Sequence, residues 1–452
     1  MFSYYVRMAL KSFRRTPGLT ALMVCAVALG IGVCVITMTV YHAMSGNPIW
    51  WKGDRLFAVT MDDWDPNHPY DPRHPNLPPP QLTYKDAMYL FGSRIPQRKV
   101  VTDEMQSVVT GGVAQRKPLP VLTRGTTADF FPMFDVPFKY GSGWDAAVDQ
   151  NVAPVAVLSK DLNEKLFGGV NSVGHVIRWE DHEVRIVGVL DDWFPKPRFY
   201  DLNDDAFSAP DDIYVPLSWA IALEHYPDGG NTAAWRPEPV NTFQDFLGSD
   251  AVWTQMWVEL PDSASRERMQ SLMDNYWAEQ HKAGRFPKPR DNRLTNVGQW
   301  LKDQGVVQND NRILVGISFA FLAVCLLNTV GILLAKFLNS AALSGVRRAL
   351  GASRRQIFIQ HLVEVGVLAM VGAVFGLALG ALGLWGVHAL YAGSYAVGSV
   401  AGDRGGYQEL THFDTVSVVW AVVLAIVSAV AAGLYPAWRI GRVSPAVYLK
   451  SQ

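Results

Sequence analysis

Residues 19–41, LTALMVCAVALGIGVCVITMTVY, contain no charged side chain. They form the centre of a longer interval, between Arg15 and Lys52, that also lacks Asp, Glu, Lys and Arg. As a helix rising about 1.5 Å per residue, this stretch is long enough to cross the roughly 30 Å hydrocarbon core of a bilayer. It is also much longer than the roughly 7–15 apolar residues of a signal peptide. The stretch therefore predicts a transmembrane helix that remains in the mature protein.

Three further stretches, 313–335, 365–391 and 415–438, have more than twenty residues each without a charge. One stretch of this kind fits a buried helix of a soluble protein, but four in one chain favour a membrane protein. We therefore predict four transmembrane helices, at residues 19–42, 312–336, 361–391 and 415–438.

The charges are distributed asymmetrically about these helices. Residues 1–18, 335–360 and 439–452 carry twelve basic residues and no acidic one, whereas the rest carries 28 basic and 40 acidic residues when Glu364, at the membrane edge, is set aside. Because Lys and Arg concentrate on the cytoplasmic side, both termini are expected in the cytoplasm, with the chain in the bacterial inner membrane. The formal net charge of −1 argues against a nucleic-acid partner.

The first eighteen residues predict a cytoplasmic amphipathic helix that lies in the headgroup layer and contacts membrane lipid. Apolar residues share one face and basic residues another: Phe2, Val6, Ala9, Leu10 and Phe13 against Arg7, Lys11 and Arg14. Thr16-Pro17-Gly18 then turns the chain into the first span.

Residues 43–311 have the mixed charge and short alternating segments of a water-soluble α+β domain. The three cysteines, Cys25, Cys34 and Cys325, fall in predicted spans, so this region folds without disulfides. Expected strands and helices are Leu56–Met61, Val155–Leu158, Val184–Val189 and Val252–Leu260, then Lys160–Phe167 and Ala264–His281. The sequence thus predicts an integral membrane α-helical protein with four transmembrane helices and a large α+β periplasmic domain inserted between helices 1 and 2.

Two connecting segments and a tail complete this organisation: a cytoplasmic hairpin at 337–360, a short periplasmic loop at 392–414 and a cytoplasmic tail at 439–452. Within the exported domain, the segment Asp62–Pro80 is rich in proline and aspartate. Its aspartates could bind a hard metal ion, but no calcium-loop spacing is present, which favours an extended surface loop.

Motifs for catalysis are missing from the sequence. The nearest approach to a phosphate-binding loop, Gly169–Val176, has His175 where lysine is required, and is interpreted as a turn. No zinc pattern and no nucleophile elbow occurs. Buried charges are missing from the spans: Glu364 lies at an edge, and only His388 lies well inside a charge-free run. The energy source is therefore expected outside this polypeptide. We therefore expect a chain that is not an enzyme by itself and holds no cofactor.

The segment Ser344–Gln356, SGVRRALGASRRQ, links the second and third spans. A helix is expected through Leu350, ended by Gly351 in a left-handed conformation, and Ser353 with Gln356 forms a capping box for the next helix. The arginines fit attraction to anionic lipid. The defined turn and the apolar residues among the arginines favour a surface that docks another protein.

Glycine recurs every fourth residue in the third span, at Gly372, Gly376 and Gly380. Small residues at this spacing let helix backbones approach closely. Two interpretations remain open: helix packing within one subunit, or an interface between two permease subunits.

Three segments resemble the MacB/FtsX class of ABC-transporter permeases. GVRRALGASRRQIFIQHLVE, residues 345–364, is similar to the signature R-E-I-G-x-R-[RK]-A-L-G-A-[ST]-x-x-x-I…Q-x-L-x-E. Residues 153–194 resemble the V-L-S…L-F-G…G…V-V-G-V pattern of the MacB-type periplasmic core, and YPAWRIGRVSPAVYLK, residues 435–450, resembles the family's C-terminal tail.

This resemblance implies a permease subunit of a MacB-like ABC exporter. Such subunits dimerise and bind cytoplasmic ABC ATPase subunits, which hold ATP and Mg²⁺, and transmit conformational change to the periplasmic domain for efflux. The implied ATPase-coupling residues are Gly345, Val346, Arg347, Arg348, Ala349, Leu350, Gly351 and Ala352. A periplasmic adaptor and an outer-membrane channel are further candidate partners.

Two departures from the family pattern carry expectations of their own. The chain begins sixteen residues before its first span, so the ATPase is expected to be a separate subunit. Leu343 stands where the family signature has an acidic residue. This difference favours a paralogous second permease as the partner over an identical one. Alternative functions are a Lol-like permease that extracts lipoproteins, an FtsX-like regulator, or a ligand sensor that signals across the membrane.

Overall fold

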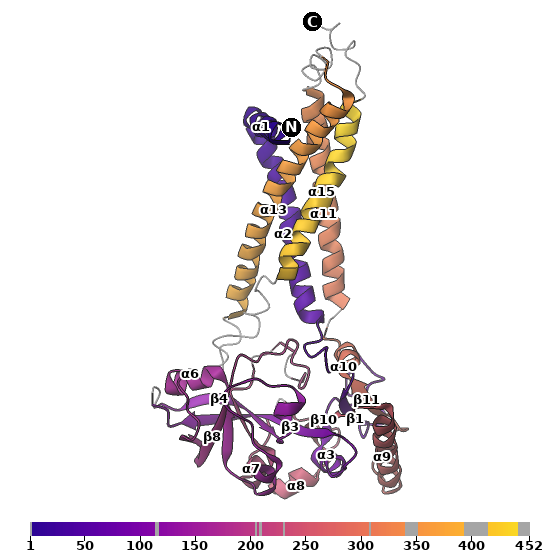
Figure 1. Ribbon diagram of the computed structural model, residues 1–452. Coiled ribbons are helices and arrows are strands. Elements are labelled where there is room, and N and C mark those ends of the chain that lie inside the picture. Colours follow the sequence, from indigo (N-terminus) through magenta and orange to yellow (C-terminus); the bar gives the residue numbers. More distant parts are fainter. Residues whose placement is uncertain are drawn as a thin grey trace. The chain divides into compact units, whose positions relative to one another are not determined.

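The structure, a computed structural model, describes residues 2–113, 117–203, 206–207, 210–228, 231–306, 309–339, 351–392 and 415–441. These residues form two compact units. One unit is helical, and the other contains all the described strands (Figure 1).

The helical unit has five described helices, four of which are long and apolar enough to cross a membrane. They run side by side in Figure 1, and their apolar segments are residues 17–42, 312–338, 354–386 and 422–439. The bounds of the five are α1 (Phe2–Arg15), α2 (Pro17–Ser45), α11 (Asn309–Asn339), α13 (Arg354–Ala392) and α15 (Thr415–Gly441). The prediction of four long apolar helices is confirmed.

The break between α1 and α2 falls at Thr16, inside the predicted Thr16-Pro17-Gly18 turn. Pro17 is the first residue of α2, where a missing N–H costs nothing and the fixed φ of proline suits a helix. The amphipathic pattern of residues 2–15 therefore forms a helix of its own, and its Ala9 is buried.

The strands of the second unit form an eleven-stranded sheet within the described part of the chain. Along its main path the order is β11-β1-β10-β3-β4-β9-β6-β8-β5, while β2 pairs with β10 and β7 pairs with β3 and β8. All pairs are antiparallel except β4–β9 and β6–β8. The strand bounds are β1 (Leu56–Met61), β2 (Leu82–Thr83), β3 (Arg98–Thr110), β4 (Leu119–Thr126), β5 (Phe138–Gly141), β6 (Val155–Leu158), β7 (Val176–Trp179), β8 (His182–Leu190), β9 (Ile213–Pro216), β10 (Val252–Glu259) and β11 (Asn292–Asn296).

Strand β3 joins two halves of this sheet. Its first half pairs with β10, with Val100 opposite Trp257, and its end pairs with β7, with Val109 opposite Trp179. Two apolar clusters follow this division. One packs β1, β10 and β11 against α3 (Tyr84–Phe91) and α9 (Ser263–Lys282). The other packs β4, β6, β8 and β9 against α6 (Lys160–Phe167) and α7 (Leu217–Ala222).

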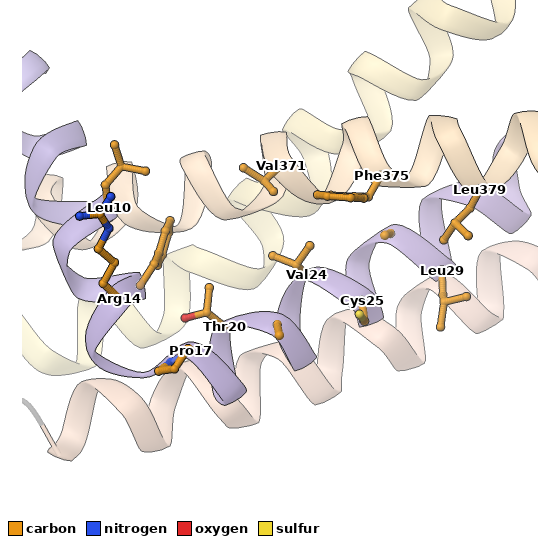
Figure 2. Close-up of a pocket in the computed structure, with 13 residues that line it drawn as sticks. Leu10, Arg14, Pro17, Thr20, Val24, Cys25, Leu29, Val371, Phe375 and Leu379 are labelled. Carbon is orange, nitrogen blue, oxygen red and sulfur yellow. The ribbon is translucent and has the colours of Figure 1, made fainter.

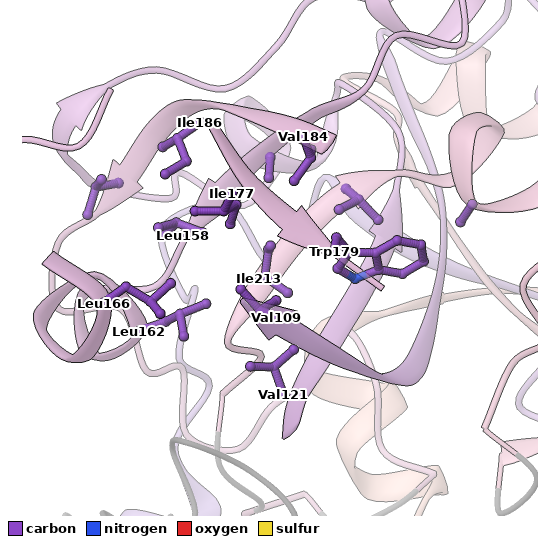
Figure 3. Packing of buried hydrophobic residues seen from close by; sticks show 14 of the residues in the cluster. Val109, Val121, Leu158, Leu162, Leu166, Ile177, Trp179, Val184, Ile186 and Ile213 are labelled. Atoms are coloured by element: carbon purple, nitrogen blue, oxygen red, sulfur yellow. The ribbon is translucent and has the colours of Figure 1, made fainter. Parts of the chain in front are cut away.

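Figure 3 shows the second cluster, in which Leu162 and Leu166 of α6 lie beside Leu158 of β6. Trp179 is fully buried there, and its indole N–H donates to Thr123 Oγ1 at 3.0 Å. The helices of this unit are α3 (Tyr84–Phe91), α4 (Phe130–Met133), α5 (Ala146–Gln150), α6 (Lys160–Phe167), α7 (Leu217–Ala222), α8 (Phe243–Gly248), α9 (Ser263–Lys282) and α10 (Val297–Asp303).

The predicted elements of this unit are confirmed with small shifts. Leu56–Met61, Val155–Leu158 and Lys160–Phe167 have the expected bounds. The expected strand at 184–189 lies inside β8, β10 ends one residue early, and α9 is one residue longer at each end than expected. Residues 169–175 form the turn between α6 and β7, as predicted, and Val176 begins β7.

A buried ionic network lies where β3 and β4 pair. The guanidinium of Arg124 has no exposed surface and donates to three carboxylates: Asp201 at 2.6 Å, Asp211 at 2.8 Å and Glu104 at 2.9 Å. Arg198 adds a second contact to Glu104, at 2.7 Å. Burial alone would raise the pKa of Asp211, but the two guanidinium groups hold it below its usual range.

Candidate coupling site

A buried ion pair joins Lys336 of α11 to Glu364 of α13. These two residues flank the predicted hairpin at 337–360. Lys336 Nζ lies 2.8 Å from Glu364 Oε1, and the two side chains are only 7% and 5% exposed. Lys336 is in the last turn of α11, where a cation interacts favourably with the helix dipole.

The same carboxylate binds α1. Ser12 Oγ donates to Glu364 Oε1 at 2.7 Å, and the ring of Phe13 lies under Lys336 Nζ at 5.0 Å. We call Ser12, Lys336 and Glu364 the ionic clasp. Three helices meet in it, and Ser12 of α1 lies 352 residues before Glu364 of α13 in the sequence.

His361 and Phe337 surround the clasp. His361 Nδ1 lies 3.5 Å from Glu364 Oε2, and the His361 ring is 4.2 Å from that of Phe337. A buried pair of charges is costly to separate, because each ion would remain in an apolar environment without its partner. The clasp therefore holds α1, α11 and α13 in one arrangement.

Most of the predicted coupling residues, Gly345, Val346, Arg347, Arg348, Ala349 and Leu350, lie outside the described residues, as does Leu343. Gly351 is described and has a φ of +103°, in the region that favours glycine, as predicted. Ala352 precedes the cap of α13.

The predicted capping box is confirmed. The backbone N–H of Ser353 donates to Gln356 Oε1 at 2.8 Å, and the N–H of Gln356 donates to Ser353 Oγ at 3.2 Å. These two bonds fix where α13 begins and therefore where the segment from the second span enters the third.

The glycines of the third span lie against α2. A methyl group added at Gly372 would come within 2.8 Å of Val27, and one at Gly376 within 3.0 Å of the carbonyl oxygen of Ala28. A methyl group at Gly32 would lie 3.7 Å from the backbone nitrogen of Gly380. These glycines thus allow α2 and α13 of one chain to approach closely.

The sequence placed Glu364 at the membrane edge but did not predict a partner for it. In the structure Glu364 is 4% exposed and paired with Lys336. The sequence contained one indication of this pair: Lys336 directly follows the second apolar run and Glu364 directly precedes the third, so both are expected on the same side of the membrane. Only the structure shows that they meet.

The segment Asp62–Pro80 contributes to a polar cavity of about 500 Å³ in the sheet-bearing unit. Tyr70, His74, Asn203 and Asn231 are among its lining residues. Partial burial would raise the pKa of Asp71, but hydrogen bonds from Arg73 and His74 lower it to about 2. No group of three or more metal-binding side chains occurs among the described residues.

Sequence models of two families match this chain. The MacB-like periplasmic core domain matches residues 20–276, which is more than half of the chain, and the FtsX-like permease C-terminal domain matches residues 315–445. The chain belongs to the MacB/FtsX-type ABC transporter permeases. The first match includes the sheet-bearing unit up to Tyr276, and the second includes α13 and the ion pair of the clasp.

Several curated relatives of this permease are named as ATP-binding/permease proteins. The pyoverdine export ATP-binding/permease protein PvdT of Pseudomonas fluorescens is 25% identical over 330 residues, which cover 73% of this chain and 42% of PvdT. The macrolide export ATP-binding/permease protein MacB of Wolinella succinogenes is 24% identical over 72% of this chain and 43% of MacB. The permease spans about two fifths of the length of these relatives.

Among solved structures, the periplasmic region of MacB from Actinobacillus actinomycetemcomitans matches 55% of this chain and 92% of its own, at 14% identity and a TM-score of 0.35.

Proposed function

We propose that this permease transmits ATP-driven conformational change from separate cytoplasmic ATPase subunits to its periplasmic domain, and thereby supports export. The ionic clasp is the observation that carries the proposal. A force applied to the segment between α11 and α13 would act on Lys336 and Glu364 first, and Ser12 would transmit it to α1.

The clasp makes these three helices move together. Because a buried ion pair that loses one partner costs several kcal/mol, about 3–5, the helices are expected to tilt as a group and not to slide past one another. The close approach of α13 to α2 at Gly376 would extend this group to the first span. Movement of α2 and α11 then reaches the periplasmic domain, because the chain enters that domain from α2 and leaves it into α11.

The orientation and partners follow from the charge asymmetry and the family. Both termini are proposed to be cytoplasmic, in the bacterial inner membrane, with ATP and Mg²⁺ bound by the ATPase. A second permease, paralogous because Leu343 replaces the usual acid, would complete the transporter. Export of a small molecule is supported by the names of the relatives, which export pyoverdine and macrolides.

Co-purification with the ATPase tests the proposal. Replacing Arg347 and Leu350 with aspartate should abolish association, because both changes place a carboxylate on the proposed docking surface. The matched control for Arg347→Asp is Arg15→Asp, which makes a charge change of the same size in α1, on the proposed cytoplasmic side. Association that is unchanged by the hairpin variants would refute the role of residues 345–352.

Photo-cross-linking of the periplasmic domain tests the export step. Products with a periplasmic adaptor support efflux, whereas products with lipoproteins would instead support lipoprotein extraction.

A further inference from the structure

A large apolar groove lies between α1, α2 and α13. Its volume is about 900 Å³, and Figure 2 shows its two walls. Val24, Cys25 and Leu29 come from α2, whereas Val371, Phe375 and Leu379 come from α13. Leu10 and Arg14 of α1 lie together at one end, near Pro17 and Thr20.

The walls of the groove offer almost nothing to a polar ligand. The hydroxyl of Thr20 already donates to the carbonyl oxygen of Thr16, at 2.9 Å. Phe375 is 56% exposed and Leu29 is 49% exposed, so large apolar side chains remain uncovered in the chain alone. An occupant must therefore be apolar over most of its length.

The length of the groove matches one leaflet of a membrane. From Pro17 to Leu29, α2 rises roughly 18 Å at 1.5 Å per residue. Half of the hydrocarbon core is about 15 Å thick. A lipid tail that begins at the level of α1 would therefore reach about as far as the groove does.

Among the described residues that line the groove, Arg14 is the one with a charged side chain. Among the described residues no ion pair involves Arg14, and α1 contains no acidic residue to neutralise it. Arg7, Lys11 and Arg15 add positive charge to the same short helix. This arrangement is complementary to a phosphate at the headgroup level, with its tails below.

We propose that this groove binds an anionic phospholipid of the cytoplasmic leaflet, with its phosphate at Arg14 and an acyl chain between α2 and α13. The site rests on the proposed orientation of the chain but not on its coupling to an ATPase. A bound lipid would contact both α1 and α13, and the groove is also lined by Phe13, whose ring lies 5.0 Å from Lys336 Nζ of the clasp. Membrane composition could therefore influence the arrangement of these helices.

The native cysteines provide a direct test. Cys25 is exposed in the groove, whereas Cys34 and Cys325 are buried. In the full-length detergent-purified chain, alkylation of Cys25 by N-ethylmaleimide, measured by mass spectrometry, should slow about tenfold when phosphatidylglycerol is added at ten times its dissociation constant. Phosphatidylcholine at the same concentration should slow the alkylation less than twofold. By the same occupancy relation, that result means that this concentration lies below its dissociation constant.

Two charge reversals on α1 separate the groove from general surface attraction. Arg14→Glu should remove the protection by phosphatidylglycerol, whereas Arg15→Glu, one residue along and not in the groove wall, should retain it. Protection by both lipids alike, or equal loss in both variants, would overturn the proposal. Efficient formation of a Cys25–Cys25 disulfide between two chains would also overturn it, because a second copy would then occupy the groove. None of these results would bear on the proposed coupling to the ATPase.

Discussion

Arg124 is the residue on which the buried network of the sheet-bearing unit depends. Its guanidinium is fully buried and binds Glu104, Asp201 and Asp211. Arg124→Met would leave three buried carboxylates with Arg198 as their remaining cation in the network. We expect a loss of about 3–5 kcal/mol in the free energy of unfolding, measured by chemical unfolding of the detergent-solubilised chain with tryptophan fluorescence.

Arg55→Met is the matched control for this change. Arg55 also pairs with a fully buried carboxylate, that of Glu259, but its side chain is 48% exposed, and Arg98 lies 2.7 Å from the same carboxylate. Arg55→Met should lower the free energy of unfolding by no more than about 1 kcal/mol, as for other exposed ion pairs. Equal losses in the two variants would show that burial of the Arg124 network adds no stability.

Asp63 makes the stability of this unit depend on pH. Burial, reinforced by Asp86, raises its pKa well above the ordinary value, although Arg285 lies 3.6 Å away and opposes the shift. The folded chain therefore holds this proton more tightly than the unfolded chain does. The resulting stability is present below the ordinary aspartate pKa, about 3.9, and is lost as pH rises through the folded value.

Asp63→Asn should remove this loss, because an amide does not ionise. Relative to the parent chain, its melting temperature should rise by about 1–2 °C near pH 8, which is roughly 1 kcal/mol for a unit of this size, and by much less near pH 4. A gain of equal size at both pH values would contradict the assignment of the effect to ionisation.

At the scale of whole elements, sequence periodicity predicted those parts of the fold that depend on local pattern. Runs of apolar residues gave the four long helices, the short apolar segment at 56–61 gave β1, and Ser353 with Gln356 marked the start of α13. Strand β3 was missed because its residues Asp103, Glu104 and Gln106 are polar, although the first two are buried. Their partners lie on distant segments, which no local pattern reveals.

The clasp was missed for the same reason, since it joins three helices through single side chains. A double-mutant cycle can measure it. Lys336→Met and Glu364→Gln should each lower the melting temperature of the chain, because each leaves one partner buried and unpaired. Each should also lower the degree to which the permease stimulates ATP hydrolysis by the proposed partner ATPase. The double variant should recover part of the loss, with a coupling energy of about 0.5–3 kcal/mol. Strictly additive losses would show that the two residues act independently.

Two glycines of α13 provide a second test at this scale. Gly376→Val should separate α13 from α2, because even a methyl group there comes within 3.0 Å of the carbonyl oxygen of Ala28. A loss of about 1–3 kcal/mol is expected from such overpacking, measured as a lower melting temperature of the detergent-purified chain. Gly386→Val is the control, because nothing lies within 4 Å of the corresponding methyl group. The reverse order of stabilities would contradict the α2–α13 contact.

At the scale of the whole molecule, the charge asymmetry fixes a prediction for the orientation of both units. Lys11 lies on the exposed side of α1, and Val113 is 74% exposed in the sheet-bearing unit. In a background without Cys25, Cys34 and Cys325, Val113→Cys should react with a membrane-impermeant maleimide in spheroplasts. Lys11→Cys should react only after the inner membrane is opened, because basic segments remain in the cytoplasm. The opposite labelling pattern would place the sheet-bearing unit in the cytoplasm, where it could not act on exported molecules, and the proposed transmission of force would have to be abandoned.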